Sequence, residues 1–388
     1  DPQPAGNISS QDAAGLFGGE LVLSASQIED FYRCPFRYFC RYGLRVEPLQ
    51  RAEFSPLVSG TAIHAVLEQM VRLHGGKALG EMDPAALHAE VVELMNQYLE
   101  GLVAAPQVLG ARKLYLFNRM VSILVRVLQR LGGEFAQSVF QPAGVEVRVG
   151  DGGPVEALRV QTQSGSVSVC GSIDRVDLME LDGQKYARVV DYKSGGKRFD
   201  LPDVYYGLNM QMLVYLYALC GGGKGQYAGC LPAGILYFPA KAEALNLPRE
   251  TPQQEADAKQ GASMHMNGLL LRDRKVLEAM EQNLAEEYIP AALKKDNAFS
   301  TRSLTASQEE FEKIRRHVMR LIGEMGDGLC GGRVAPDPAD GGGPRSCENC
   351  DYAGLCHNDR AGDRPARPEV KVDEFYALLD REEGEKKA

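Results

Sequence analysis

The segment Val189-Val190-Asp191-Tyr192-Lys193-Ser194-Gly195 begins with apolar residues, continues with an aspartate and a lysine, and ends in the small, turn-forming residues Ser194 and Gly195. Side chains two residues apart in a strand project to the same face, so Asp191 and Lys193 should point together into one cleft while Tyr192 packs behind them. The segment therefore predicts a buried strand that carries a charged site on one face.

A second acidic strand end precedes this one along the chain. In Gly171-Ser172-Ile173-Asp174-Arg175-Val176-Asp177, Asp174 would supply a second carboxylate from the neighbouring strand. Asp177 is three residues further on and would face the other way on a regular strand, where a salt bridge to Arg175 or a nearby basic residue explains it. Two successive strand ends of this kind favour a shared carboxylate site.

Paired carboxylates beside a lysine suit metal-dependent phosphodiester hydrolysis. A hard divalent cation such as Mg²⁺ or Mn²⁺ binds oxygen ligands, polarises a phosphate and lowers the pKa of an attacking water. Lys193 would orient or deprotonate that water and offset the charge that develops on the phosphorane. His64, in Gly60-Thr61-Ala62-Ile63-His64, lies in an apolar helix, and its candidacy as a ligand depends on the two acidic segments.

A cysteine group near the C-terminus has the spacing of a metal site, Cys347-x2-Cys350-x5-Cys356. Three thiolates can surround one metal centre, but a tetrahedral centre requires a fourth ligand. His357 or Cys330 would complete a zinc site locally, whereas Cys34, which is followed by proline, would close an iron-sulfur cluster from the far end of the chain. Spacing does not separate the two, because thiolates suit both.

Hydrophobic periodicity predicts an α+β chain whose first third is mostly helical. A capping box of Ser26 and Glu29 should open the first helix. Further helices are expected at 57–73, 84–102, 111–135, 207–219, 273–293 and 306–325. A period-two pattern predicts strands from residue 144 onward, including 234–238. Residues 1–20 are expected to form a disordered leader, and residues 363–388 a charged tail with one short amphipathic helix at 373–379.

The net charge of −9 argues against the wrapping of a long duplex, because Lys and Arg supply most of the non-specific affinity for phosphates. A nucleic acid would therefore bind in a local groove. The start of the chain has no signal-peptide pattern, and the most apolar stretch, 114–131, is interrupted by Arg119, Arg126 and Arg130. Together with an odd number of cysteines, nine, these features predict a cytoplasmic protein without a membrane span.

These motifs together resemble the C-terminal nuclease domain of the AddB subunit of bacterial AddAB helicase-nucleases and, more widely, RecB-type exonucleases. Further markers are Leu23-Ser24-Ala25-Ser26-Gln27-Ile28-Glu29 and Cys34-Pro35-Phe36-Arg37-Tyr38-Phe39. The resemblance implies a PD-(D/E)XK restriction-endonuclease-like mixed sheet flanked by helices over residues 21–362. This domain would comprise a helical part at 21–140, a catalytic core at 141–300, and a C-terminal helix with the cysteine cluster at 301–362.

The resemblance also assigns roles to single residues. The family's metal ligands match His64, Asp174 and Asp191, and its catalytic residues match the same two aspartates together with Lys193. Gln211 and Tyr215 match a Q-x-x-x-Y motif and, one helical turn apart, would contact the DNA strand beside the metal. Apart from the resemblance, candidate phosphate contacts are Lys197, Arg198 and Arg175, and candidate base-stacking surfaces are Tyr205, Tyr206 and Tyr215.

The family's cluster cysteines match Cys34, Cys347, Cys350 and Cys356, which favours a 4Fe-4S cluster over zinc. Such a cluster would join the two ends of the nuclease domain. Closing the long loop between Cys34 and Cys347 removes entropy from the unfolded chain, although the dependence on length is only logarithmic.

The expected function is a metal-dependent nuclease that cuts single-stranded DNA, as an exonuclease or endonuclease, during double-strand break processing and recombinational repair. A helicase partner subunit would supply ATP-driven unwinding, since Gly221-Gly222-Gly223-Lys224-Gly225 lacks the Ser or Thr that follows lysine in a Walker A loop. One alternative is a catalytically silent DNA-binding and subunit-docking module. Another is a zinc-ribbon-like interaction protein, which leaves the paired carboxylates unexplained.

Overall fold

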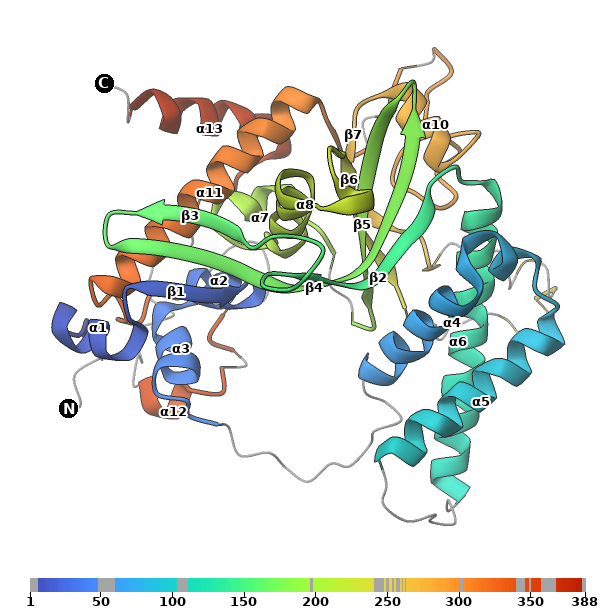
Figure 1. Cartoon of the computed structure of the whole chain (residues 1–388), viewed down its shortest axis with the longest axis horizontal. Helices are drawn as coiled ribbons and strands as arrows, with labels where there is room; N and C mark the ends of the chain where they lie inside the picture. Colours follow the sequence, from blue (N-terminus) through green and yellow to red (C-terminus); the bar gives the residue numbers. More distant parts are fainter. Residues whose placement is uncertain are drawn as a thin grey trace.

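The computed structural model describes residues 6–47, 60–102, 111–195, 198–240, 263–296, 298–300, 303–339, 346–348, 350–356 and 368–385, with isolated positions between 248 and 261. Its strands are β1 (Glu20–Ser24), β2 (Gln141–Val149), β3 (Leu158–Thr162), β4 (Gly165–Leu181), β5 (Gln184–Lys193), β6 (Leu231–Pro239), β7 (Asn267–Leu271) and β8 (Thr305–Ala306). They form one sheet in the order β1-β4-β5-β6-β7-β8, and β2 and β3 also pair with β4 (Figure 1).

The sheet is mixed, and its long strand β4 joins two halves. The first half of β4 pairs in parallel with β1 and antiparallel with β3. Its second half pairs antiparallel with both β2 and β5, and β5 continues in parallel with β6. A mixed sheet flanked by helices confirms the predicted fold class. Asp191 lies near the end of β5, as expected, whereas Asp174 lies in the middle of β4 and not at a strand end, because β4 continues to Leu181 in its pairing with β2 and β5.

Helices cover the sheet in two groups (Figure 1). The first group is α4 (Gly60–Glu81), α5 (Pro84–Leu102) and α6 (Ala111–Gln137), in which α4 packs against α5, α6 and β2. The second includes α8 (Gln211–Gly222), which packs on β5 and β6, and α11 (Gln308–Cys330), which packs on β3 and β4. The remaining α-helices are α1 (Ser10–Phe17), α2 (Ala25–Arg33), α3 (Pro35–Tyr38), α7 (Leu201–Tyr205), α10 (Arg274–Met280), α12 (Ala353–Cys356) and α13 (Val372–Glu385).

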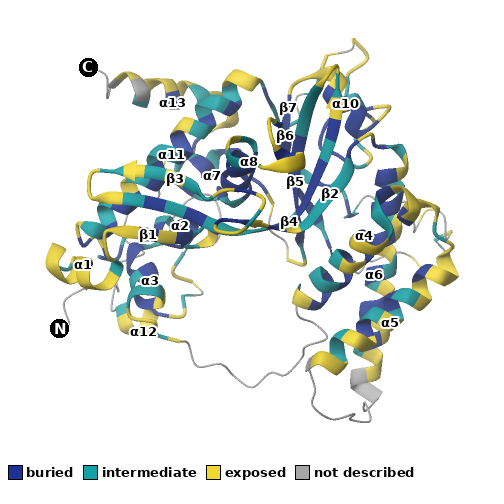
Figure 2. Ribbon diagram, viewed as in Figure 1, coloured by how far each residue is buried: buried dark blue, intermediate teal, exposed yellow. Residues whose placement is uncertain are grey.

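Burial follows this layering. In Figure 2 the central strands are dark blue, whereas the outer faces of α5 and α13 are yellow. Helix α8 is apolar on nearly all sides, and every residue from Met212 to Leu219 is buried, as is typical of a helix inside a core. Among the described helices, none combines the length and the apolar character needed to span a membrane.

The first residues differ from the expected disordered leader. Helix α1 begins after Ser9, whose hydroxyl accepts a hydrogen bond from the backbone N–H of Asp12. The Asn7 side chain accepts hydrogen bonds from the backbone N–H groups of Val334 and Ala335, so this segment is bound to the residues that follow α11. Polar and glycine residues suggested disorder, but side-chain caps of this kind satisfy the backbone locally.

The expected capping box at Ser26 and Glu29 is wrong by two residues. Ser24 caps α2, and its hydroxyl and backbone N–H pair reciprocally with Gln27. Both residue pairs fit the capping-box pattern, but strand β1 ends at Ser24 and the helix begins at once. The Glu29 carboxylate therefore does not cap its own helix, and it accepts a hydrogen bond from Gln211 of α8.

The expected helix at 273–293 is also too long. Helix α10 ends at Met280, and the buried Glu281 carboxylate then accepts hydrogen bonds from four backbone N–H groups, of residues Ala285, Glu287, Tyr288 and Ile289. Leu284 and Glu286 have positive φ angles of 43° and 59°. The carboxylate stabilises this turn in place of a further helix, an interaction that periodicity alone does not reveal.

Candidate active site and metal centre

Three neighbouring strands bring their carboxylates into one row. The paired residues Val145–Arg175 and Val147–Ile173 flank Glu146 of β2 and Asp174 of β4, and the pair Arg175–Val190 adjoins Asp174 and Asp191 of β5. Residues that face each other across a sheet project to the same side, so the three side chains are neighbours. The expected proximity of Asp174 and Asp191 thus follows from the way β4 turns directly into β5.

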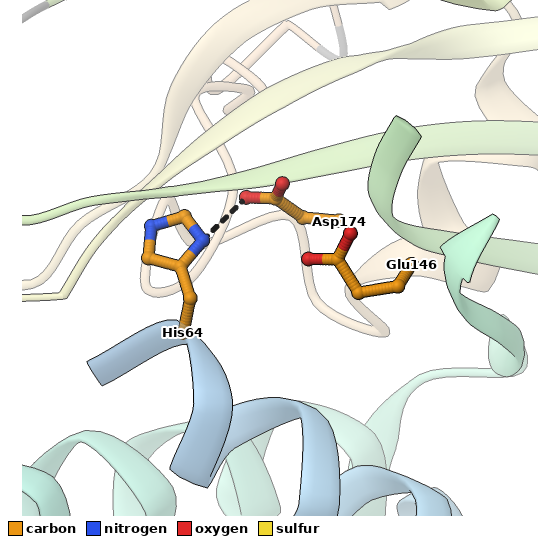
Figure 3. Close-up of side chains that lie close together, drawn as sticks. All are labelled: His64, Glu146 and Asp174. Carbon is orange, nitrogen blue, oxygen red and sulfur yellow. Dashed lines mark ion pairs between the residues drawn. The ribbon is translucent and has the colours of Figure 1, made fainter. Parts of the chain in front are cut away.

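His64 reaches this row from the first turns of α4. Its Nδ1 lies 3.2 Å from Oδ2 of Asp174, and ligand atoms of His64, Asp174 and Glu146 all lie within 4.8 Å of one another (Figure 3). Two carboxylates and an imidazole are a suitable donor set for a divalent cation such as Mn²⁺, and carboxylate oxygens also suit Mg²⁺. The three residues therefore form a candidate metal centre.

Glu146 is the site residue that the sequence analysis missed. Its backbone has a φ of 48°, a left-handed conformation that non-glycine residues seldom adopt and that is often found at functional sites. Its carboxylate accepts a hydrogen bond from the Ser172 hydroxyl at 2.7 Å, which orients it next to Asp174. The available signal was an acidic residue between Val145 and Val147, on a strand that precedes the Asp174 strand.

Backbone and cation contacts orient the other two acids. The Tyr192 backbone N–H donates to Oδ2 of Asp174 at 3.0 Å. Lys193 Nζ lies 2.6 Å from Oδ2 of Asp191, and the same ammonium lies 5.4 Å from the centre of the Tyr237 ring. Asp191 and Lys193 therefore point together, as the strand pattern predicts.

The negative charges of Asp174 and Asp191 repel each other. Burial and, second, the negative charge of Asp174 raise the pKa of Asp191 to about 6, although Lys193 opposes this change. The hydrogen bond with Asp174 raises the pKa of His64. A bound divalent cation would offset the repulsion between these carboxylates.

We expect Asp191→Asn to stabilise the metal-free protein at neutral pH. The pKa of Asp191 is raised from 3.8 to about 6 by folding, so the cost of ionising it is absent below pH 4 and fully present above pH 6. The variant should gain roughly 1–3 kcal/mol over wild type as pH rises through this window. Urea unfolding in chelator at both ends of the window measures this gain, and a constant difference would contradict it.

Helix α8 brings Gln211 and Tyr215 to the same region. Burial raises the pKa of Tyr215 to about 12, and the negative charge of Asp174 adds to this effect, while a hydrogen bond with Gln211 opposes it. The Tyr215 hydroxyl lies so close to Gly171 that a Cβ at that glycine would overlap it. Tyr215 is therefore a buried tyrosine with a protonated hydroxyl near Asp174, and its burial contradicts the expected role of its ring as a stacking surface for bases.

Asp177 lies on the opposite side of β4 in a buried group of four charges. Its carboxylate oxygens lie 2.9 Å from Nε of Arg175 and 2.9 Å from Nε of Arg188. Glu134 of α6 pairs with both arginines, and all four side chains are fully buried. The salt bridge expected for Asp177 is confirmed, whereas burial excludes Arg175 as a phosphate contact.

The remaining residues expected to contact DNA are two basic residues and two tyrosines. Lys197 lies outside the described residues, and Arg198 is exposed. The Tyr205 ring stacks on His317 with centroids 5.6 Å apart, and the Tyr206 hydroxyl donates to the carbonyl of Pro368. These two tyrosines are thus engaged in contacts with α11 and with the segment before α13.

Three of the four expected cluster cysteines gather at one place. Cys34, Cys350 and Cys356 pack around a small core of Phe36, Cys40 and Tyr352, and Figure 1 shows α12 beside α3. Burial, followed by these three thiols, raises the pKa of Cys40 to about 11. Cys347 is exposed, and its carbonyl accepts the Cys350 N–H at 3.3 Å, so it adjoins this group. His357 lies outside the described residues.

Cys330, the other local candidate, packs instead against the main core, with its thiol 3.7 Å from the carbonyl of Gly18. The structure thus brings Cys34 from the start of the domain to two cysteines from its end. This arrangement fits a thiolate-bound metal group that joins the two ends.

Comparison with known proteins agrees with this geometry. The family model of the PD-(D/E)XK nuclease superfamily matches residues 22–357. The chain is 31% identical over 387 residues to a subunit of the ATP-dependent helicase/deoxyribonuclease of Clostridium acetobutylicum, covering 97% of this chain and 34% of that protein. The corresponding subunits from Acetivibrio thermocellus and Thermoanaerobacter sp. are 29% and 27% identical, again over 97% of this chain.

The chain spans about a third of the length of these relatives. The family match, in contrast, extends from β1 to the cysteine group and includes all or part of every strand of the sheet. The chain therefore belongs to the PD-(D/E)XK nuclease superfamily.

Proposed function

We propose that the chain is a DNA nuclease domain that depends on a divalent metal, Mg²⁺ or Mn²⁺. The observation that carries this proposal is the row of Glu146, Asp174 and Asp191, with His64 at one end and Lys193 at the other. On the opposite side of β4, the charged side chains are fully buried and paired with one another. The acidic row is therefore the side of the sheet that can bind a metal and a substrate.

Each residue would have a distinct task. His64, Glu146 and Asp174 would hold the cation, which when bound polarises the scissile phosphate and lowers the pKa of a water. Asp191, which the resemblance assigns to the metal ligands, would complete the acidic site beside Asp174 and hold the Lys193 ammonium in place. Lys193 would orient the attacking water and offset negative charge on the phosphate in the transition state.

Two side chains of α8, Gln211 and Tyr215, would bind the DNA strand. Gln211 and Tyr215 lie one turn apart near Asp174, and burial raises the pKa of Tyr215 still further above neutral pH, so its hydroxyl keeps its proton. A protonated hydroxyl donates a hydrogen bond to a phosphate oxygen, and a glutamine side chain can do the same. We assign these residues to the positioning of the phosphodiester beside the metal.

The substrate would be single-stranded DNA, cut while a helicase partner subunit unwinds a double-strand break for recombinational repair in the cytoplasm. The names of the relatives, which combine helicase and deoxyribonuclease, support this context. A catalytically silent docking module is the alternative, but it gives no reason for a lysine held 2.6 Å from a buried carboxylate in the acidic row.

Degradation of end-labelled single-stranded DNA tests the proposal. The anaerobically purified chain should cut in the presence of Mg²⁺ or Mn²⁺, and chelator should stop the reaction. Asp191→Ala should lower the rate by at least about 100-fold, because it removes a carboxylate from the site and the partner of Lys193. Cutting that continues in chelator or in the variant would contradict the proposal.

We further propose that Cys34, Cys347, Cys350 and Cys356 bind a 4Fe-4S cluster, with zinc as the alternative. Cys34→Ser should then lower the iron content from about four atoms per chain to nearly none and lower the Tm. Cys330→Ser, which changes a thiol outside the group, should keep both values. Elemental analysis and visible absorption of the two variants decide the question. Zinc without iron would contradict the cluster, and retained iron in Cys34→Ser would exclude Cys34 as a ligand.

A further inference from the structure

We propose that Glu29 is a positioning residue that caps helix α8 from helix α2 and so holds Gln211 and Tyr215 beside the metal centre. Its catalytic consequence rests on the proposed nuclease function. The cap itself does not, and it can be tested separately. Neither the family match nor the charge pattern of the sequence assigns a role to this side chain.

Helix α8 has no cap of its own. The residue before its first turn is Met210, which provides no side-chain hydrogen bond to the helix. The first backbone N–H groups of a helix have no partner within it, and α8 is buried, so water is a poor substitute. Oε1 of Glu29 accepts the Gln211 N–H at 3.0 Å. A carboxylate at this end also interacts favourably with the helix dipole.

The cap acts on the part of α8 that faces the site. Gln211 is the first residue of the helix, and Tyr215 follows one turn later, with its hydroxyl packed against Gly171 of β4. The negative charge of Glu29 is one of the effects that raise the pKa of Tyr215. Displacement of the α8 N-terminus would therefore shift the Tyr215 hydroxyl relative to Asp174.

Glu29 is well placed to serve as a fixed point. Its side chain is 7% exposed, and its helix begins at the capping box of Ser24 and ends at Arg33, directly before Cys34. The Tyr32 hydroxyl donates to the Leu321 carbonyl of α11 at 2.6 Å, and the Tyr32 ring packs against Gly207, where a Cβ would overlap it. Helix α2 is thus anchored on both sides of Glu29 and connects the cysteine group to the active site.

Two substitutions distinguish the effect of the capping hydrogen bond from the effect of side-chain size. Glu29→Ala removes the acceptor, whereas Glu29→Gln keeps an oxygen that can accept the Gln211 N–H. We expect Glu29→Ala to lower kcat on single-stranded DNA by about 10–100-fold with KM changed by less than about threefold, because the buried Glu29 side chain would act through the position of α8. Glu29→Gln should retain most of the activity. Glu180→Ala, at an exposed position of β4, is the matched control and should behave as wild type.

Hydrogen exchange supplies a readout that needs no activity. Glu29→Ala should speed amide exchange in the peptide that contains the first turn of α8, while Glu29→Gln and Glu180→Ala should not. Unchanged exchange and kcat in Glu29→Ala would overturn the proposal, as would exchange that rises throughout the chain or a KM that rises while kcat is constant. If the wild-type chain fails to cut DNA with any metal, the nuclease proposal fails, and exchange alone still decides whether Glu29 caps α8.

Discussion

Asp174→Asn is expected to lower the rate of single-stranded DNA cutting by about 1000-fold or more, the largest loss of activity for any single substitution in this chain. Asp174 contacts His64, shares the candidate metal centre with Glu146 and lies close enough to Asp191 to raise its pKa, so it is the central acid of the row. Asparagine removes the charge that holds a cation but keeps an oxygen that can accept the Tyr192 N–H. Removal of a preorganised charge from such a site costs several kcal/mol of transition-state stabilisation.

The measurement is the initial rate at saturating metal, with urea unfolding of the same preparation. The variant should be folded and at least as stable as wild type without metal, because the repulsion between Asp174 and Asp191 is relieved. Asp182→Asn is the matched control, since Asp182 lies in an exposed turn and pairs there with Lys275. A rate for Asp174→Asn within tenfold of the control would show that the acidic row is not the site of cutting.

The same chemical change three residues along the strand should have the opposite result. Asp177→Asn is expected to destabilise the fold by about 3–5 kcal/mol, because it leaves buried arginines without their main counter-charge. Asp177 contacts both Arg175 and Arg188 at 2.9 Å, and none of these side chains is exposed to solvent. Few single substitutions elsewhere in the chain should reduce the free energy of unfolding as much.

Urea or thermal unfolding measures this effect, with Asp182→Asn again as the control and expected to leave stability nearly unchanged. The double variant Asp177→Asn, Arg188→Met should lose less than the sum of the two single variants, because the residues share one interaction. Additive losses, or a stable Asp177→Asn, would mean that the four charges do not act as one buried group.

Much of this site was predictable because its chemistry follows strand periodicity. Asp191 and Lys193 are two residues apart and point together, and Asp177 is three residues from Asp174 and points away. Short connections also helped, since β4 leads directly into β5 and places Asp174 beside Asp191. The alternation of side-chain direction along a strand was therefore sufficient to predict the proximity of Asp174 and Asp191 and the structural role of Asp177.

Other features depend on contacts that periodicity does not encode. Glu146 joins the metal centre through an unusual backbone angle and the register of β2 on β4. Glu281 ends a helix by accepting N–H groups from the following turn. Glu29 fits a local capping box in the sequence but instead reaches a helix far along the chain. In each case the partner of one carboxylate lies outside the helix or strand that carries it, and only the assembled fold shows that partner.

The most direct test of the metal centre is the Mn²⁺ dependence of cutting by wild type and by Glu146→Gln. The substitution keeps the size of the side chain and its bond to Ser172 but removes one of the charges near His64 and Asp174. We predict that wild type reaches its full rate at low Mn²⁺, whereas Glu146→Gln needs at least about tenfold more metal. The same Mn²⁺ dependence for both proteins would contradict a metal centre built from Glu146, His64 and Asp174.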